Sequence, residues 1–280
     1  MVLYVSREVV LLMVLVENSF LNGFLEFTFL IAVLYLGSLA ILFTVGLITM
    51  AVNKRYPERR IQKRQADHRM VDDIKSSMVQ VMVTSVCLAI GLYAQYRGWT
   101  VTPFELSWWS APLFFGLSLV LHDAWFYWGH RILHTKAFYK FHKPHHLNIT
   151  PTVWSNDAGS TVDTLFAHSY YALVLFVVPM PAVVFIAHRI FDQVTALLGH
   201  CGFEHFASPT ARRPWPLLCT LYHDQHHQHF VYNYANYFSF WDRFCGTIHP
   251  TYDDKVLGFE ELYATQRSGG KAAAGASGKD

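Results

Sequence analysis

The chain has 280 residues, of which 52% are hydrophobic and 15% are charged, with a formal net charge of +2. Soluble globular domains average about 25% charged residues, so the composition argues against an ordinary soluble protein and indicates a membrane protein. The small net charge says little by itself, and the placement of the charges is more informative.

Apolar segments long enough to cross a membrane occupy the first half of the chain. Residues 27–52 form an uncharged run of 26 residues, which would make a helix of about 39 Å at about 1.5 Å per residue. Residues 78–96 and 107–128 are predicted to form two further spans. Their low charge favours spans over the alternative of buried helices in a large soluble core.

A further apolar segment, residues 164–187, is interrupted by Pro179-Met180-Pro181. Proline interrupts a helix, and each half is short for a complete crossing. We therefore predict a tight helical hairpin over residues 164–199.

A basic segment directly follows the first apolar run. Residues 54–69, KRYPERRIQKRQADHR, contain seven Lys or Arg against two acidic residues. Beside a membrane span, the positive-inside rule places such a segment in the cytoplasm and disfavours the alternative of a nucleic-acid-binding arm. We expect no nucleic-acid partner.

Counting the spans from this segment predicts the whole topology. The histidine-rich segments that follow residues 107–128 and the hairpin would all lie on the cytoplasmic side. The predicted fold is an all-α integral membrane bundle of about three transmembrane helices plus the hairpin, with a cytoplasmic histidine-rich helical cap holding a dimetal site. Residues 1–265 would form one domain, and the Gly/Ala/Ser-rich residues 266–280 a disordered tail.

Histidines gather in three groups with helical spacing. His130 and His134 are four residues apart in HRILH, so on a helix they would project from one face. HKPHH and HDQHH each place three histidines at i, i+3 and i+4. Pro144 suits only the first turn of a helix, so we expect His142 at a helix entry. The second and third groups comprise His142, His145, His146, His223, His226 and His227.

Eight imidazoles on neighbouring faces predict a site for transition metals. Imidazole suits iron, zinc, copper and nickel, and eight donors exceed the four ligands of a tetrahedral zinc site, so the number implies two metals. A proton relay or pH sensor also gathers histidines, but it needs no repeated spacing. We assign no role to His68, His168, His188 and His249.

Carboxylates flank the histidines where they could orient ligand rings. A metal-bound imidazole usually donates its other N–H to a carboxylate or a carbonyl. The candidates for this role, with solvated charge as the alternative, are Asp123, Asp192, Glu204 and Asp224.

Three stretches of the sequence extend the histidine groups: HDAWFYWGHRILHTKAFYKFHKPHH from His122, GHCGFEH from Gly199 and HDQHHQHFVYNYANYFSFWDRFCGT from His223. Together they resemble the sterol desaturase/fatty acid hydroxylase superfamily of membrane di-iron enzymes. The last stretch looks closest to the C4-methylsterol oxidase and cholesterol 25-hydroxylase branches. Asn233 and residues 241–243 are expected to brace the third histidine group.

The resemblance implies a ligand set for two iron ions. It comprises His130, His134, His142, His145, His146, His200, His223, His226 and His227. His200, in HCGFE, matches an additional histidine of the family pattern. His122 and His205 are further candidates.

The resemblance also implies O2-dependent hydroxylation of a sterol or another long-chain lipid. The alternatives are desaturation on the same scaffold and a non-enzymatic membrane metal-binding protein. Electrons would come from NAD(P)H through a separate carrier, a cytochrome b5 with its reductase or a ferredoxin, because the sequence contains no nucleotide-binding or haem-binding motif. A eukaryotic member would lie in the endoplasmic reticulum membrane and a bacterial one in the inner membrane, each as a multi-pass protein.

Overall fold

The regular secondary structure of the described residues is entirely helical, as predicted. The computed structural model describes residues 7–63, 69–214 and 216–276, where the only β feature is an isolated bridge between Arg60 and Phe203. The α-helices are α1 (Arg7–Arg55), α2 (Met70–Tyr96), α3 (Ser110–Leu133), α4 (Tyr139–His142), α5 (Thr161–Leu173), α6 (Ala182–Gly199), α7 (Thr220–His229), α8 (Phe240–Phe244) and α9 (Tyr252–Ala276). The 3-10 turns are η1 (Pro57–Arg59), η2 (His145–Leu147), η3 (Val153–Ser155) and η4 (Val174–Phe176).

Three helices of the described chain are long and apolar enough to cross a membrane. They are Leu21–Arg55 within α1, all of α2, and α6. We predicted the third span at residues 107–128, whereas the structure places it at α6. Helix α3 carries His122, Asp123, His130 and Arg131 in its second half, and α6 is long and apolar enough to cross a membrane without its hairpin partner.

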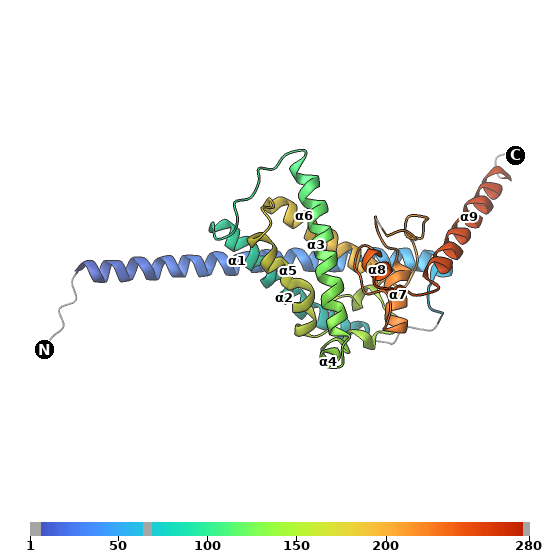
Figure 1. Cartoon of the computed structure of the whole chain (residues 1–280), viewed down its shortest axis with the longest axis horizontal. Coiled ribbons are helices and arrows are strands. Elements are labelled where there is room, and N and C mark those ends of the chain that lie inside the picture. Colours follow the sequence, from blue (N-terminus) through green and yellow to red (C-terminus); the bar gives the residue numbers. More distant parts are fainter. Residues whose placement is uncertain (1–6, 64–68, 215, 277–280) are drawn as a thin grey trace.

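Helix α1 is continuous and long, and it provides one side of the bundle. Its C-terminal part contacts α2 and α6, whereas its N-terminal part extends beyond the other helices (Figure 1). Large apolar side chains such as Phe29 and Leu36 are 71% and 65% exposed. Exposed apolar surface of this extent is typical of a helix that faces lipid.

The predicted break at the proline pair is confirmed. Helix α5 is followed by η4, and α6 begins directly after Pro181. Two carbonyl groups of the break accept hydrogen bonds from outside it: Pro179 O from the Phe104 N–H and Met180 O from Gln95 Nε2, both at 2.9 Å. The polar groups freed by the prolines are thus satisfied within the protein.

The core between the long helices is apolar and closely packed. Leu88, Leu175 and Phe185 are buried in one cluster supplied by α2, η4 and α6. Gly91 allows α2 to approach α5, since a β-carbon there would lie 2.4 Å from the Tyr171 carbonyl oxygen. Small residues at helix contacts serve the same purpose in membrane proteins generally.

The C-terminal helices α7, α8 and α9 form a second core. Tyr222 and Leu221 of α7 pack with Tyr252 and Val256 of α9. Helix α9 continues to Ala276 and so includes part of the tail predicted to be disordered, whereas residues 277–280 lie outside the described residues.

Asp242 connects the segments of this second core. Its carboxylate accepts the Tyr234 and Ala235 N–H groups at 3.0 and 2.8 Å, the Thr247 hydroxyl at 2.7 Å and the Tyr222 hydroxyl. The side chain is fully buried. It therefore braces the loop after α7, as expected for residues 241–243.

Replacing Asp242 with alanine should lower the free energy of unfolding by about 3 kcal/mol or more. Each buried donor left without a partner costs about 1–3 kcal/mol. The change should appear as a clear drop in melting temperature of the purified protein. Asp253→Ala is the control, because Asp253 forms a surface ion pair with Arg243, for which a loss below about 1 kcal/mol is expected. Equal effects of the two substitutions would contradict this role of Asp242.

Candidate metal centre

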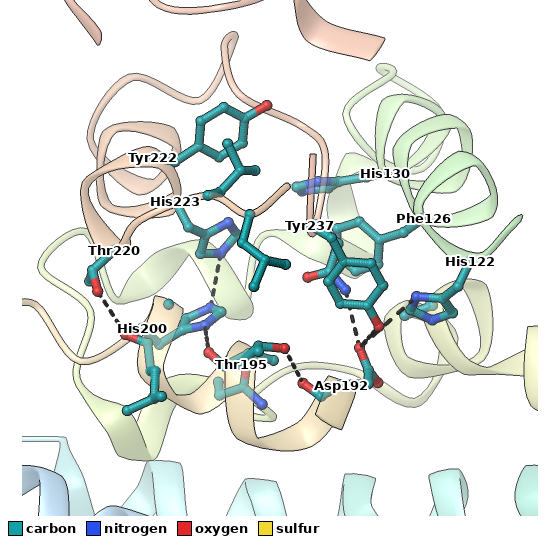
Figure 2. A pocket seen from close by; sticks show the side chains of 18 of the residues that line it. His122, Phe126, His130, Asp192, Thr195, His200, Thr220, Tyr222, His223 and Tyr237 are labelled. Carbon is teal, nitrogen blue, oxygen red and sulfur yellow. Dashed lines mark hydrogen bonds and ion pairs between the residues drawn. The ribbon is translucent and has the colours of Figure 1, made fainter. Parts of the chain in front are cut away.

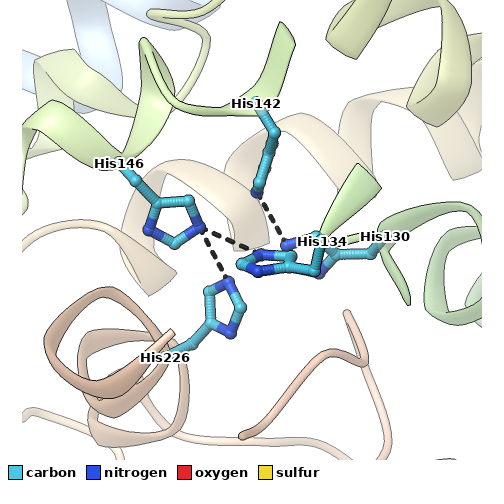
Figure 3. Close-up of side chains that lie close together, drawn as sticks. All are labelled: His130, His134, His142, His146 and His226. Atoms are coloured by element: carbon cyan, nitrogen blue, oxygen red, sulfur yellow. Dashed lines mark hydrogen bonds between the residues drawn. The ribbon is translucent and has the colours of Figure 1, made fainter. Parts of the chain in front are cut away.

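Nine histidines from five segments form two compact groups. Within each group, one ligand nitrogen per residue lies within 4.8 Å of all the others. The first group, drawn in Figure 3, is His130, His134, His142, His146 and His226. The second group is His145, His200, His223 and His227. The two sets are the histidines that the family resemblance implied.

Helix ends and short turns bring these rings together. His130 lies in the last turn of α3 and His134 caps its C-terminus, while His200 caps the C-terminus of α6. Helix α7 presents His223, His226 and His227 from one face, as their spacing predicts.

The prediction that His142 begins a helix is wrong. His142 is the last residue of α4, and Pro144 is the N-cap of the following turn η2, which carries His145 and His146. The proline separates two short helical pieces because it cannot donate a hydrogen bond inside a helix. The bend directs His145 into one group and His142 and His146 into the other.

Hydrogen bonds at Nδ1 define the tautomer of several rings. His130 Nδ1 donates to the Tyr234 carbonyl at 2.8 Å, His226 Nδ1 to Tyr232 O at 2.6 Å, and His200 Nδ1 to Ala196 O at 2.9 Å. Two more rings also donate from Nδ1. His145 donates to Ala158 O at 3.2 Å, and His142 donates to the Asp163 carboxylate at 3.0 Å. Carbonyls and carboxylates only accept, so the Nδ1 atoms carry the protons.

The opposite nitrogens of these rings therefore carry bare lone pairs that face one another. His130 Nε2 lies 3.0 Å from His142 Nε2, and His145 Nε2 lies 3.4 Å from His200 Nε2. Two unprotonated nitrogens at this separation repel each other and cannot form a hydrogen bond. A cation held between them removes the repulsion, so the donor set fits metal ions.

The chain reversal after α7 supplies two of the carbonyl acceptors. Phe230 and Asn233 adopt left-handed backbone conformations, with φ of 63° and 57°. Asn233 also donates from Nδ2 to Tyr222 O at 2.9 Å, which ties the turn to α7. The reversal brings the Tyr232 and Tyr234 carbonyls to the ligand rings, and Asn233 braces the third group as expected.

Burial keeps the histidines neutral. It lowers the pKa of His134 and of His200 to about 3, with a further contribution from neighbouring histidines. The pKa values of His142, His146, His223, His226 and His227 lie well below the usual 6.5 for the same reasons. Neutral imidazole is the form that binds a metal.

The metal-free protein should lose stability as the pH falls from 7.5 to 5.5. The unfolded chain takes up protons at its histidines near pH 6.5, whereas the folded clusters resist protonation until far lower pH. At pH 5.5, one unit below the usual pKa of 6.5, each such histidine lowers the free energy of unfolding by about 1.4 kcal/mol. Thermal melting of chelator-treated protein at the two pH values measures the effect. A pH-independent melting temperature would contradict neutral, buried clusters.

The four flanking carboxylates have other partners in the structure. Asp123 accepts three backbone N–H groups of residues 236–238, and Asp192 pairs with Arg189 at 2.9 Å. Glu204 accepts the Leu221 and Phe206 N–H groups, and Asp224 accepts from Gln62 Nε2. These bonds tie helices and loops together around the centre.

Asp163 is the carboxylate that contacts a ligand ring, and the sequence analysis missed this role. It lies in the first turn of α5, 3.0 Å from His142 Nδ1. Burial raises its pKa to about 6. Asp163 lies 21 residues after His142 in the sequence. No helical periodicity relates residues at this separation, so the sequence did not predict the contact.

The two further ligand candidates lie outside both groups. His205 bonds Asn53 at 2.8 Å and Arg59 at 3.3 Å. His122 lies two turns before His130 on α3. Among the histidines given no role, His249 contacts Gln225 and Thr251, whereas His68 lies outside the described residues.

A cavity of about 400 Å³ opens beside the second histidine group. His130, His142, His145, His200 and His223 are among the residues that line it. Figure 2 shows His200 and His223 on one side, with His122 and Asp192 on the other. Its walls, including Phe126, are more apolar than polar. The dimensions suit a ligand the size of a lipid segment.

These features define a helical protein with membrane-spanning helices and a buried polyhistidine centre that can hold metal ions. Residues 115–247 match the model of the fatty acid hydroxylase family. Through this region the chain is similar to proteins of the sterol desaturase/fatty acid hydroxylase superfamily.

Similar proteins include enzymes named for sterol oxidation. The chain is 36% identical to mouse lathosterol oxidase over 48% of its own length and 44% of that protein. It is 30% identical to chicken methylsterol monooxygenase 1 over 53% and 48%, and 26% identical to a Delta(7)-sterol 5(6)-desaturase of Leptosphaeria maculans over 68% and 53%. The matches thus cover about half of the length of these relatives. No solved structure matches the chain.

Proposed function

We propose that this chain catalyses the O2-dependent hydroxylation of an aliphatic carbon of a sterol or another long-chain lipid, at a centre of two iron ions. The observation that carries the proposal is the set of bare Nε2 atoms that face one another in two adjoining groups. The five-histidine group would hold one ion and the four-histidine group the other. When bound, the irons supply the redox chemistry that attack on an unactivated C–H bond requires.

The chain itself contributes binding and orientation. The cavity reaches the histidines of both groups, so a lipid within it would present a carbon to the centre while the walls exclude water. Orientation of this kind replaces a chance encounter with an intramolecular step. Helices α3, α5 and α6 all line the cavity, which supports residues 1–265 acting as one membrane-embedded domain.

Each turnover would consume two electrons from a separate carrier, a cytochrome b5 or a ferredoxin supplied by NAD(P)H. The basic segment 54–69, of which residues 64–68 lie outside the described residues, is the candidate docking segment, with anionic lipid headgroups as the alternative ligand. Arg59 of this segment is already engaged by Tyr56 and Tyr263 through cation–π contacts. Lys54 and Arg55 at the end of α1 are exposed and suit docking better.

The same segment supports a proposed placement in the membrane. With residues 54–69 in the cytoplasm, the polyhistidine centre would lie at the cytoplasmic face of a multi-pass protein. The host membrane would be the endoplasmic reticulum in a eukaryote and the inner membrane in a bacterium.

Desaturation is the second candidate, because several similar proteins are named sterol desaturases. Both reactions begin by breaking an aliphatic C–H bond. They differ in whether oxygen enters the lipid.

Incubation with 18O2, a reducing system and a panel of sterols, fatty acids and ceramides tests the proposal. We expect a lipid product that gains one 18O atom, detected by mass spectrometry. A product that loses two hydrogens without gaining 18O would identify a desaturase. If the iron-loaded protein gives no product from any of these lipid classes, both candidate reactions are contradicted.

A further inference from the structure

A second group of polar side chains, each buried or half-buried, lines the cavity beside the histidine centre. Helix α3 contributes one member, α5 another, α6 two, and the loop after η3 the fifth. We call this group the distal polar cluster, and it consists of His122, Asp157, His168, Arg189 and Asp192.

Several atoms of this cluster have no hydrogen-bond partner among the described residues. Arg189 is 4% exposed and donates from Nη1 to Asp192 at 2.9 Å, but its Nε and Nη2 atoms are unpartnered. His122 is 1% exposed, and neither ring nitrogen is bonded, since Asp192 Oδ1 lies 4.0 Å away. A buried polar atom without a partner is unfavourable, so a ligand that satisfies these atoms would gain affinity.

His188 provides the contrast within the same helix. It is fully buried beside Arg189 and does not line the cavity. Its ring is bonded at both nitrogens, to Ser118 Oγ at 2.7 Å and Tyr237 Oη at 3.2 Å. The unpartnered groups of the distal polar cluster therefore coincide with the cavity wall.

The charges of the cluster favour an uncharged ligand group. Arg189 is the one cation of the five residues, and it interacts with two carboxylates, Asp192 and Asp157. A carboxylate ligand would meet two like charges. A hydroxyl instead can accept from Arg189 and donate to the unpartnered Asp157 Oδ2.

Two helices set the separation of His122 and Asp192 from the histidine centre. On α3, His122 precedes His130 by eight residues, and on α6, Asp192 precedes His200 by eight. Eight residues of helix correspond to roughly 12 Å. A ligand bound at both ends would therefore span a distance of this order.

We propose that the distal polar cluster binds an uncharged hydroxyl group of the lipid, while a carbon on the order of 10 Å away lies at the histidine centre. A hydroxylated lipid such as a sterol then binds in preference to a free fatty acid. This inference rests on the proposed function, because it concerns the substrate of the same cavity.

Binding to the metal-loaded protein in nanodiscs tests the inference without requiring turnover. The probes are cholesterol, 5α-cholestane, which lacks the hydroxyl, and stearate, which carries a charge. We expect cholesterol to bind at least tenfold more tightly than either. Arg189→Met and Asp157→Asn should each abolish this preference, whereas His188→Gln, the matched control outside the cavity, should retain it.

Equal affinity for cholesterol and 5α-cholestane in the unaltered protein would overturn the inference. A preference for cholesterol that persists in Asp157→Asn with normal metal content would also overturn the inference. If Arg189→Met does not fold, the result for Asp157→Asn decides the test. Failure to oxidise any lipid while the preference is present would overturn the proposed function alone.

Discussion

Replacing His226 with alanine is expected to reduce the metal content from two ions per chain to one and to lower lipid oxidation by more than about 100-fold. His226 belongs to the five-histidine group, and its Nε2 lies 3.1 Å from His146 Nε2. Loss of a residue that only orients a ligand already costs 10–100-fold in affinity or activity, and loss of the donor itself should cost more.

The corresponding change in the four-histidine group, His223→Ala, should remove the other ion. Elemental analysis of the purified variants gives the stoichiometry directly. His205→Ala is the matched control, since His205 is bonded to Asn53 and lies outside both groups. Two metals per chain in His226→Ala, or a metal lost in His205→Ala, would contradict the ligand sets.

Asp163→Asn should weaken metal binding by about 10–100-fold, the range found for residues that support ligating histidines. The amide oxygen can still accept the hydrogen bond from His142 Nδ1, but the negative charge that makes the imidazole a stronger donor is lost. Asp163→Ala removes the hydrogen bond as well, so a larger loss is expected.

This effect is measured by competition with a chelator, and the readout is the amount of metal that remains on the protein. Asp72→Asn, at an exposed acidic residue in the first turn of α2, is the control and should behave like the unaltered protein. Unchanged retention in both Asp163 variants would show that the carboxylate does not support the centre.

The two histidine groups adjoin, which matters for chemistry that needs two metals. The rings of His146 and His227, from different groups, have centroids 4.8 Å apart, and those of His142 and His145 are 5.3 Å apart. One reacting molecule could therefore contact both ions. Two independent structural sites would not require such proximity.

Hydroxylation and desaturation place the same demand on this scaffold up to the first C–H cleavage. The later steps depend on where the lipid carbon lies relative to the centre. Under the proposed function, the cavity and its distal polar cluster would determine that position, so they are the features to compare with the sterol enzymes that the chain resembles.

Local patterns in the sequence were sufficient to predict α1, α2, the break before α6 and the histidine face of α7. Uncharged runs identify α1 and α2, and the proline pair identifies the break before α6. The i, i+3 and i+4 spacing of HDQHH places three imidazoles on one face of α7. These inferences succeed because helical geometry relates residues that are neighbours in sequence.

The tertiary structure alone decided which distant groups meet. Asp163 of α5 reaches His142 of α4, and Arg189 of α6 lies near His122 of α3, through the packing of these helix pairs. His205 carries the same imidazole as the ligands, yet it bonds Asn53 instead. Such contacts depend on helix crossings and chain reversals, whose geometry is determined by long-range packing that no local spacing encodes.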